Sequence, residues 1–246
     1  MQTLKRLYRS NYAGEHVITS LTLGDGEWSH EKDFVPNAVF STHTTTQAVV
    51  IGNGESRRMF DLGHIARHTG GLLAKDKLQS YGCNALYRDF RPDFLVLTGD
   101  DITREVAESR YPDDYICYAN ADTVLKYPGR LYLIPQNLYY DAGSLAVYLA
   151  CFDGHKKIFL VGFDNYADEE PVNNVYKDTP GYLTSTQTQN GAWFAHSLAT
   201  VMNTYNDVEF IRVMPTDTYQ LPLEWQSITN LRQIDYRGFA LEADLG

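Results

Sequence analysis

A short Gly-rich stretch, Gly52-Asn53-Gly54-Glu55-Ser56, is the strongest candidate for a binding site, because it directly follows the apolar run Ala48–Ile51. Two glycines let the backbone approach a phosphate or a sugar closely. The start of a following helix offers unpaired N–H groups and a positive dipole end to an anion. We predict a helix from about Arg57 to His68, capped by Ser56. The nucleotide-binding residues predicted in this stretch are Gly52, Asn53, Gly54 and Ser56.

The spacing of the glycines does not match two common phosphate-binding motifs. Arg57 stands where the third glycine of Gly-x-Gly-x-x-Gly would be, so a dinucleotide site is not favoured. The stretch also lacks the Gly-Lys-Ser/Thr sequence of a P-loop. The pattern therefore favours a nucleotide site of another kind.

Three carboxylates follow predicted strands and are candidates for acid–base or metal chemistry. Asp100 and Asp101 come after Phe94–Thr98, and Asp164 comes after Lys157–Gly162. Hard oxygen ligands suit Mg²⁺ or Mn²⁺, but Asp100 and Asp101 are adjacent rather than spaced as Asp-x-Asp. A metal role, a direct catalytic role and an N-cap role stay open for this pair. Asp164 is a candidate general base.

Strands and helices alternate from Gln47 onward, which predicts an α/β fold. The expected strands are Ala48–Ile51, Ser80–Ala85, Phe94–Thr98, Tyr115–Tyr118, Leu131–Ile134, Lys157–Gly162 and Val208–Val213. Further helices are expected to end near Glu108 and to span Gly143–Phe152 and Gly191–Thr204. We predict a single doubly wound, mostly parallel, Rossmann-like sheet within residues 46–246, with helices on both faces.

Ligands of such sheets lie beyond the carboxyl ends of the strands. The residues expected there are Gly52 to Ser56, Asn84, Gly99 to Asp101, Gln136 and Asn137, and Asp164 to Tyr166. Residues 1–45 carry a turn-like Gly24-Asp25-Gly26 between alternating stretches, which predicts an N-terminal hairpin or extension packed on this domain.

Composition restricts the partners. The formal net charge of −10 disfavours nucleic acid, because proteins that bind a phosphate backbone usually carry a basic face. The cysteines, Cys83, Cys117 and Cys151, lie in or beside apolar stretches and suit buried thiols in a reducing compartment. The first residues lack the apolar core of a signal peptide, and no run approaches the roughly 18 apolar residues of a membrane span. We expect a cytoplasmic protein without a membrane span, and a homo-oligomer stays open.

Several short segments, in the same order, resemble the family 42 sialyltransferases, single-domain bacterial enzymes that use CMP-activated sialic acid. The first strand of that family ends in Gly-Asn-Gly-Pro-Ser, similar to Gly52–Ser56, and its second strand carries Cys-Asn, as at Cys83-Asn84. A Ser-Gly begins a helix there and Ala142-Gly143 begins the comparable helix here, so Gly143 is a further nucleotide-binding candidate. The family's Gly-Ile-Asp-Phe-Tyr is similar to Gly162–Tyr166. The resemblance spans roughly residues 48–213.

The resemblance implies roles for individual residues. Asn53 and its neighbouring glycines would contact the nucleotide, Asn84 would bind near the base, ribose or donor sugar, and Tyr166 would approach the phosphate. A second tyrosine of the family lies in a mobile lid, here the polar segment 165–189, and Tyr176 is the nearest candidate. Phenols stabilise a departing phosphate without a metal, so no cofactor is required.

The family's general base is a histidine in the polar segment before the last helix. The comparable stretch here, Tyr182–Gln189, contains no histidine. The base is therefore unassigned, and Asp100, Asp101 and Asp164 are the carboxylates to test.

These observations lead to one main hypothesis and two alternatives. The main hypothesis is a transferase, a sialyltransferase-like glycosyltransferase that moves a group from a nucleotide-sugar-like donor to an acceptor hydroxyl. The Gly-Asn-Gly-x-Ser pattern is also similar to proteins related to archaeal pterin pyrophosphokinases, which implies Mg²⁺-dependent diphosphoryl transfer from ATP. The last alternative is a nucleotide-binding module without catalysis. The acceptor is not indicated by the sequence.

Overall fold

The computed structural model describes residues 2–9, 15–24, 27–36, 47–67, 78–135, 138–164, 173–183, 191–216 and 218–245, the first three stretches as backbone alone. Gln136, Asn137 and residues 165–172 and 184–189 of the polar segment, Tyr166 among them, lie outside the described residues. The predictions made for them therefore stay predictions.

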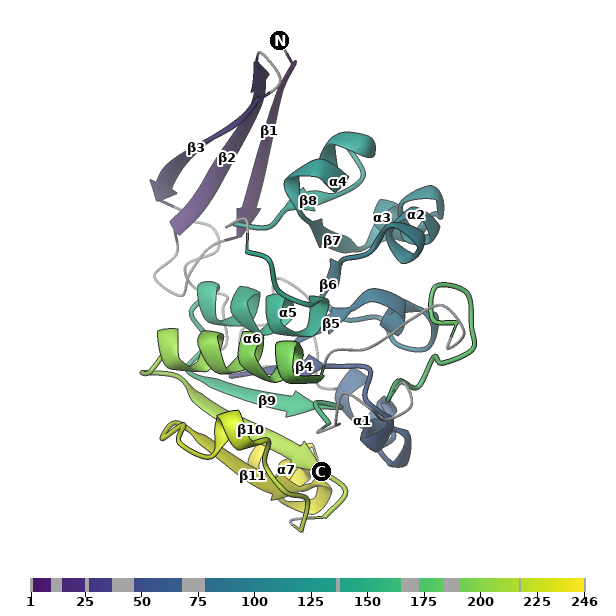
Figure 1. Ribbon diagram of the computed structural model, residues 1–246, viewed down its shortest axis with the longest axis vertical. Helices are drawn as coiled ribbons and strands as arrows, with labels where there is room; N and C mark the ends of the chain where they lie inside the picture. Colours follow the sequence, from purple (N-terminus) through teal and green to yellow (C-terminus); the bar gives the residue numbers. More distant parts are fainter. Residues whose placement is uncertain are drawn as a thin grey trace.

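In the described residues, eight parallel strands form the main sheet, in the order β11-β10-β9-β4-β5-β6-β7-β8 (Figure 1). They are β4 (Gln47–Ile51), β5 (Gln79–Cys83), β6 (Phe94–Leu97), β7 (Ile116–Ala119), β8 (Tyr132–Leu133), β9 (Lys157–Val161), β10 (Glu209–Met214) and β11 (Leu231–Asp235). The chain builds outward from β4 to β8, returns to β9 on the other side of β4, and continues to β10 and β11. The strand order thus reverses between β4 and β9, as in the predicted doubly wound fold.

Helices cover both faces of the sheet. One face carries α5 (Ala142–Phe152), α6 (Gly191–Thr204) and η4 (Leu223–Trp225). The other carries α1 (Gly63–Ala66), η3 (Asn84–Arg88), α2 (Asp100–Glu108), α3 (Tyr111–Asp114), α4 (Ala121–Lys126) and α7 (Tyr236–Glu242). Along β4, Ala48 and Val50 pack into the first core, whereas Val49 and Ile51 pack into the second. Burial on both faces explains why this strand is a continuous apolar run.

Helix α5 crosses from the outer strands back to β9. It is buried from Ala142 to Cys151, which accounts for its apolar sequence. Asp141 caps its first turn by accepting a hydrogen bond from the backbone N of Ser144. Gly154, with φ +93°, follows its last turn in the left-handed region that favours glycine. The predicted helix-to-strand return is confirmed, and α6 has the predicted bounds.

Two local predictions after the first strands are wrong. The segment after β4 is not the helix expected from Arg57, because a 3₁₀ turn, η1 (Glu55–Met59), ends at an extended Phe60 and α1 begins only at Gly63. Phe60 packs against Tyr236 and Phe239 of α7, so tertiary packing interrupts the helix. The second strand ends at Cys83, and the next residue has φ +49°.

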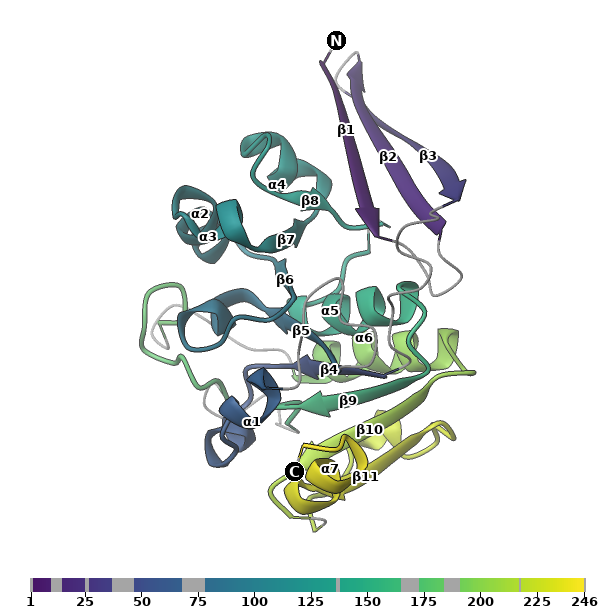
Figure 2. The same ribbon diagram turned by 180° about the vertical axis from the view of Figure 1, so that it is seen from behind.

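The N-terminal part forms a separate antiparallel sheet, β1 (Gln2–Arg9), β2 (Glu15–Gly24) and β3 (Glu27–Pro36). β2 ends at Gly24 and pairs with the start of β3 at Glu27, consistent with the predicted hairpin, whereas β1 was not predicted. Both views place this sheet beyond the β8 edge of the main sheet, with β1 next to β8 (Figures 1 and 2).

The three cysteines are buried and unbonded to one another, as predicted. Among the described residues, the helices lack the length and apolar character needed to cross a bilayer.

A buried polar cluster lies in the core beneath α5. Tyr81, Asp153 and His155 are each fully buried; the Tyr81 hydroxyl donates to Asp153 Oδ2 at 2.6 Å and lies 3.0 Å from His155 Nε2. Tyr81→Phe should lower the free energy of unfolding by about 1–3 kcal/mol, because a buried carboxylate loses a donor. Urea unfolding measures this loss, with Tyr139→Phe as the control because Tyr139 is 85% exposed. Equal stability of the two variants would show that the cluster contributes nothing.

Candidate functional site

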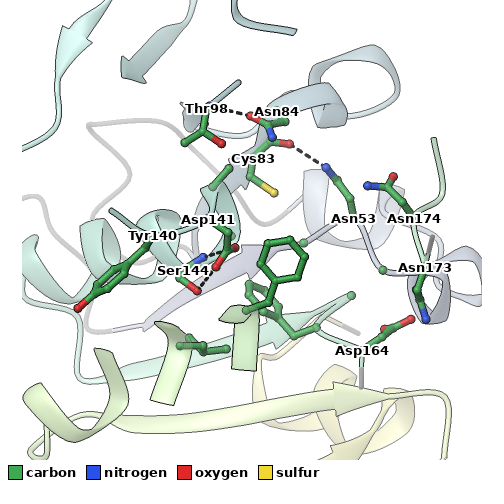
Figure 3. A pocket seen from close by; sticks show the side chains of 18 of the residues that line it. Asn53, Cys83, Asn84, Thr98, Tyr140, Asp141, Ser144, Asp164, Asn173 and Asn174 are labelled. Atoms are coloured by element: carbon green, nitrogen blue, oxygen red, sulfur yellow. Dashed lines mark hydrogen bonds between the residues drawn. The ribbon is translucent and has the colours of Figure 1, made fainter. Parts of the chain in front are cut away.

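A cavity of about 730 Å³ opens at the carboxyl ends of β4, β5, β6 and β9, where the strand order reverses (Figure 3). Doubly wound sheets bind ligands at this position. Eight residues predicted for the site line this switch-point cavity: Gly52, Asn53, Gly54, Asn84, Asp100, Asp101, Gly143 and Asp164. Eight of the 29 lining residues are thus candidates from the sequence, and their roles stay predictions.

The two glycines of the first loop pack against the loop that follows β9. Gly52 N donates to Val161 O at 2.8 Å, and Gly54 N donates to Gly162 O at 2.9 Å. A Cβ added at Gly52 would lie 2.6 Å from Gly162 O, and Gly162 itself has φ +74°. The glycines are therefore required for contact between two loops, in addition to any approach of a ligand.

Asp164 caps the start of η1. Its carboxylate accepts hydrogen bonds from Ser56 N, at 2.9 Å, and from Ser56 Oγ. The structure does not bear out the expected cap by Ser56: Gly54 is the N-cap residue, and Ser56 lies outside the cavity wall. The protein's own carboxylate thus occupies the position at which we expected an anionic ligand.

Asparagine side chains form a neutral polar wall. Asn53 Nδ2 donates to Cys83 O at 3.2 Å, whereas Asn53 Oδ1 is buried and has no hydrogen-bond partner among the described residues. Asn84 Oδ1 accepts from Thr98 N at 2.9 Å (Figure 3). Asn173 Oδ1 accepts from Glu55 N at 2.8 Å. Buried acceptors are rarely left unsatisfied, so Asn53 Oδ1 is a candidate acceptor for a ligand or a water molecule, and a donor reaches this buried atom only if the surrounding wall shifts.

Asp141 also lines the cavity, although it is not among the residues predicted from the sequence. Its Oδ1 accepts from Ser144 N at 3.0 Å and its Oδ2 accepts from Ser144 Oγ at 2.5 Å (Figure 3). Burial raises the pKa of Asp141, and the hydrogen bonds from Ser144 oppose that shift. A carboxylate with a raised pKa in a cavity is a candidate proton acceptor. The sequence pattern that could have indicated Asp141 is an aspartate at an N-cap position with Ser144 three residues later, just before an apolar run.

Aromatic side chains close the cavity on the α5 and α6 side. Its lining includes Phe163, Trp193, Phe194 and Trp225. Among the described residues, the lining contains no lysine, arginine or histidine. The cavity is therefore apolar on one side and amide-lined on the other, and its described lining offers no cation to neutralise a multiply charged phosphate chain.

Cys83 lies in the wall between Asn53 and Asn84 and is not a nucleophile at neutral pH. Burial is the main cause that raises the pKa of its thiol to about 12, so the thiol stays protonated.

Asp100 and Asp101 lie on the exposed rim. Their side chains are 85% and 71% exposed, and they pair with Lys126 at 3.1 Å and Arg104 at 2.7 Å. Gly99, with φ +85°, is the N-cap residue of α2, so an N-cap role for either aspartate is wrong. Within the part of the chain that is described, no three His, Cys, Asp or Glu side chains gather to hold a metal.

Tyr176 lies outside the cavity wall, although it belongs to a segment that touches the site. Its hydroxyl donates to Asp89 and accepts from Arg57 Nη2 at 2.6 Å. Burial raises the pKa of this phenol. The described part of the predicted lid, residues 173–183, is tied to the first loop through Val175 N, which donates to Asn53 O at 2.8 Å.

Comparison with protein-family models, curated proteins and solved structures found no match for the chain.

Proposed function

We propose that the chain is a transferase that binds a nucleotide-activated donor in the switch-point cavity and transfers a glycosyl group to an acceptor hydroxyl. The observation that carries the proposal is that two side chains line the same cavity at the switch point of the sheet. Asn53 Oδ1 is a buried acceptor without a partner among the described residues, and Asp141 supplies a carboxylate. The Asn53 amide suits recognition of a nucleotide, and the Asp141 carboxylate suits removal of a proton from the acceptor hydroxyl.

The nucleoside is expected to lie along the asparagine wall. An amide oxygen accepts only N–H or O–H groups, which a ribose hydroxyl or an exocyclic amine of a base supplies. The aromatic residues of the opposite wall offer apolar surface to the flat base and the sugar rings. Ligand pockets commonly combine such apolar walls with a few fixed polar groups.

The charge of the wall favours a donor with one phosphate. The described lining contains no cation, and the starts of η1 and α5 already accommodate the carboxylates of Asp164 and Asp141. A diphosphate or triphosphate would need a metal ion to offset its charge there. A nucleoside monophosphate diester, such as a CMP-linked sugar, carries a single negative charge and needs less compensation.

In the proposed reaction, the acceptor hydroxyl attacks the donor carbon and forms a new C–O bond. The bond between that carbon and the phosphate oxygen breaks, and the nucleotide leaves as a phosphate monoester. The hydroxyl proton passes to the Asp141 carboxylate, whose raised pKa makes it a stronger base than an exposed aspartate.

A thermal-shift screen tests the proposal with CMP, UMP, UDP, GDP, ADP and ATP, each with and without Mg²⁺ or Mn²⁺. We expect stabilisation by CMP without metal, about 2.7 kcal/mol when the ligand is present at 100 times its Kd. Asn53→Ala should weaken CMP binding by about tenfold or more, because the wall loses its unsatisfied acceptor. The matched control is Asn203→Ala, on the exposed side of α6.

Other outcomes of the screen would support the alternatives. Stabilisation by ATP only with Mg²⁺, reduced by substitution of Asp100 and Asp101, would favour diphosphoryl transfer. Stabilisation by CMP without turnover of any CMP-linked donor would favour a non-catalytic module. Absence of a shift with every nucleotide would contradict the proposed function.

A further inference from the structure

A second cavity, of about 960 Å³, lies between the segments that follow β4 and β5. Its lining includes four arginines, Arg57, Arg58, Arg88 and Arg91, and two carboxylates, Asp61 and Asp89. We call it the arginine cavity. Its charge differs from that of the switch-point cavity, whose described lining contains no cation, and from that of the whole chain, which carries −10.

The arginines of this cavity differ in how far their charge is compensated. Arg88 is fully engaged, because it pairs with Glu105 through two nitrogens and also donates to Thr179 and Pro180 O. In the part of the chain that the structure describes, Arg58 donates to Val175 O alone, and Arg91 donates to Tyr115 Oη alone. Within the described part of the chain, neither of these two has a carboxylate partner. Their guanidinium groups keep most of their donors for a ligand.

Arg57 adds a buried charge at the inner end of the cavity. Its side chain is 4% exposed, and its one carboxylate partner among the described residues, Asp89, lies 3.4 Å away and is itself 49% exposed. Its Nε has no hydrogen-bond partner among the described residues. Tyr176 Oη accepts a hydrogen bond from Arg57 Nη2 at 2.6 Å. Because a buried guanidinium is costly unless its charge is compensated, an anion bound beside Arg57 would add electrostatic compensation.

We propose that the arginine cavity binds the phosphate group of an anionic ligand through Arg57, Arg58 and Arg91. The planar fork of donors on each guanidinium matches the geometry of phosphate oxygens, and bonds between two charged groups are the strongest hydrogen bonds in proteins. The volume accommodates a phosphorylated small molecule rather than a single ion alone. The proposal does not depend on the reaction proposed for the switch-point cavity.

The segment 173–176 is a shared wall of the two cavities. Asn173 and Asn174 line the switch-point cavity, whereas Val175 and Tyr176 line the arginine cavity. Arg57 donates to the Tyr176 hydroxyl from the arginine-cavity side of this wall. An anion bound to Arg57 is therefore positioned to influence the wall of the other site.

Calorimetric titration of the full chain with inorganic pyrophosphate at low ionic strength tests the proposal. We expect saturable binding that weakens as salt is added. Arg58→Gln and Arg91→Gln should each reduce the affinity by about tenfold, and the double variant by more. Both side chains are exposed, so neither substitution disturbs the core. Arg237→Gln, which removes one exposed charge from α7, is the matched control and should bind as the native protein does.

Three outcomes would overturn the proposal. The first is the absence of measurable heat with pyrophosphate at low ionic strength. The second is the same affinity in the double variant as in Arg237→Gln. The third is a loss of pyrophosphate binding in Asn53→Ala with no loss in the arginine variants. The last result would assign the pyrophosphate to the switch-point cavity.

Discussion

Gly54→Ala is expected to destabilise the fold by about 2–3 kcal/mol and to abolish nucleotide binding. The added Cβ would lie 2.5 Å from Asp164 Cγ and 2.6 Å from Gly162 O. The carboxylate cannot move away without losing its hydrogen bonds to Ser56, and the carbonyl is backbone. The contact between the two loops must therefore open. Urea unfolding and CMP-induced thermal shifts measure the two effects.

Gly129→Ala is the matched control for this substitution. Gly129 has φ +84°, but a Cβ added there meets no atom within 4 Å. The control therefore carries only the backbone strain of a left-handed alanine, about 1–2 kcal/mol, and should leave nucleotide binding unchanged. If Gly54→Ala were as stable as Gly129→Ala and still bound CMP, the close packing of the two loops would not matter for the site.

Asp141→Asn is expected to lower the turnover of a glycosyl donor by about 100-fold or more, with CMP binding nearly unchanged. Asparagine is as good an N-cap as aspartate, so α5 keeps its cap, but an amide cannot accept the acceptor's proton. Steady-state rates and thermal shifts on the same preparations separate the loss of chemistry from any loss of binding.

The pH dependence of turnover supplies a second readout for Asp141. The base acts only when ionised, and burial raises its pKa, so the rate should fall as pH is lowered through that raised pKa. Ser144→Ala removes a hydroxyl that donates to the carboxylate and should move this acid limb to higher pH. An unchanged limb in Ser144→Ala, or a normal rate in Asp141→Asn, would assign the proton to another group.

The same group contributes to stability with a definite sign. A folded-state pKa above the unfolded one means that the native state binds its proton more tightly. The contribution of Asp141 to the free energy of unfolding therefore decreases as pH rises from the ordinary carboxyl range through the raised pKa. Asp141→Asn removes this penalty, and we expect it to be at least as stable as the native protein at neutral pH.

Long apolar segments were the predictable part of the fold. β4, β9, α5 and α6 lie within a residue of where the sequence places them, because both faces of the sheet and most of α5 are buried. The C-terminal strand β11 and helix α7 were missed. All five residues of β11 are only partly buried, so this edge strand lacks the continuous apolar run of the central strands.

The candidate site was predictable as a set of loops but not in its internal contacts. The order of strands brings the ends of β4, β5, β6 and β9 together, so residues after them line one cavity. Contacts between residues that lie far apart in the sequence determine the other contacts of the site. Asp164 accepts a hydrogen bond from Ser56, which lies 108 residues earlier in the sequence. The Tyr176 hydroxyl bonds to Asp89 and Arg57 and does not line the cavity. Asp141 was overlooked because it precedes a helix rather than following a strand.

A crystal structure of the chain with CMP tests whether the switch-point cavity binds the nucleotide. We expect electron density for the nucleotide beside Gly52–Gly54, with Asn53 Oδ1 accepting a hydrogen bond from the ribose or the base and with Asp141 facing the phosphate end. Nucleotide density in the arginine cavity alone, or a switch-point cavity without nucleotide at saturating CMP, would contradict this expectation.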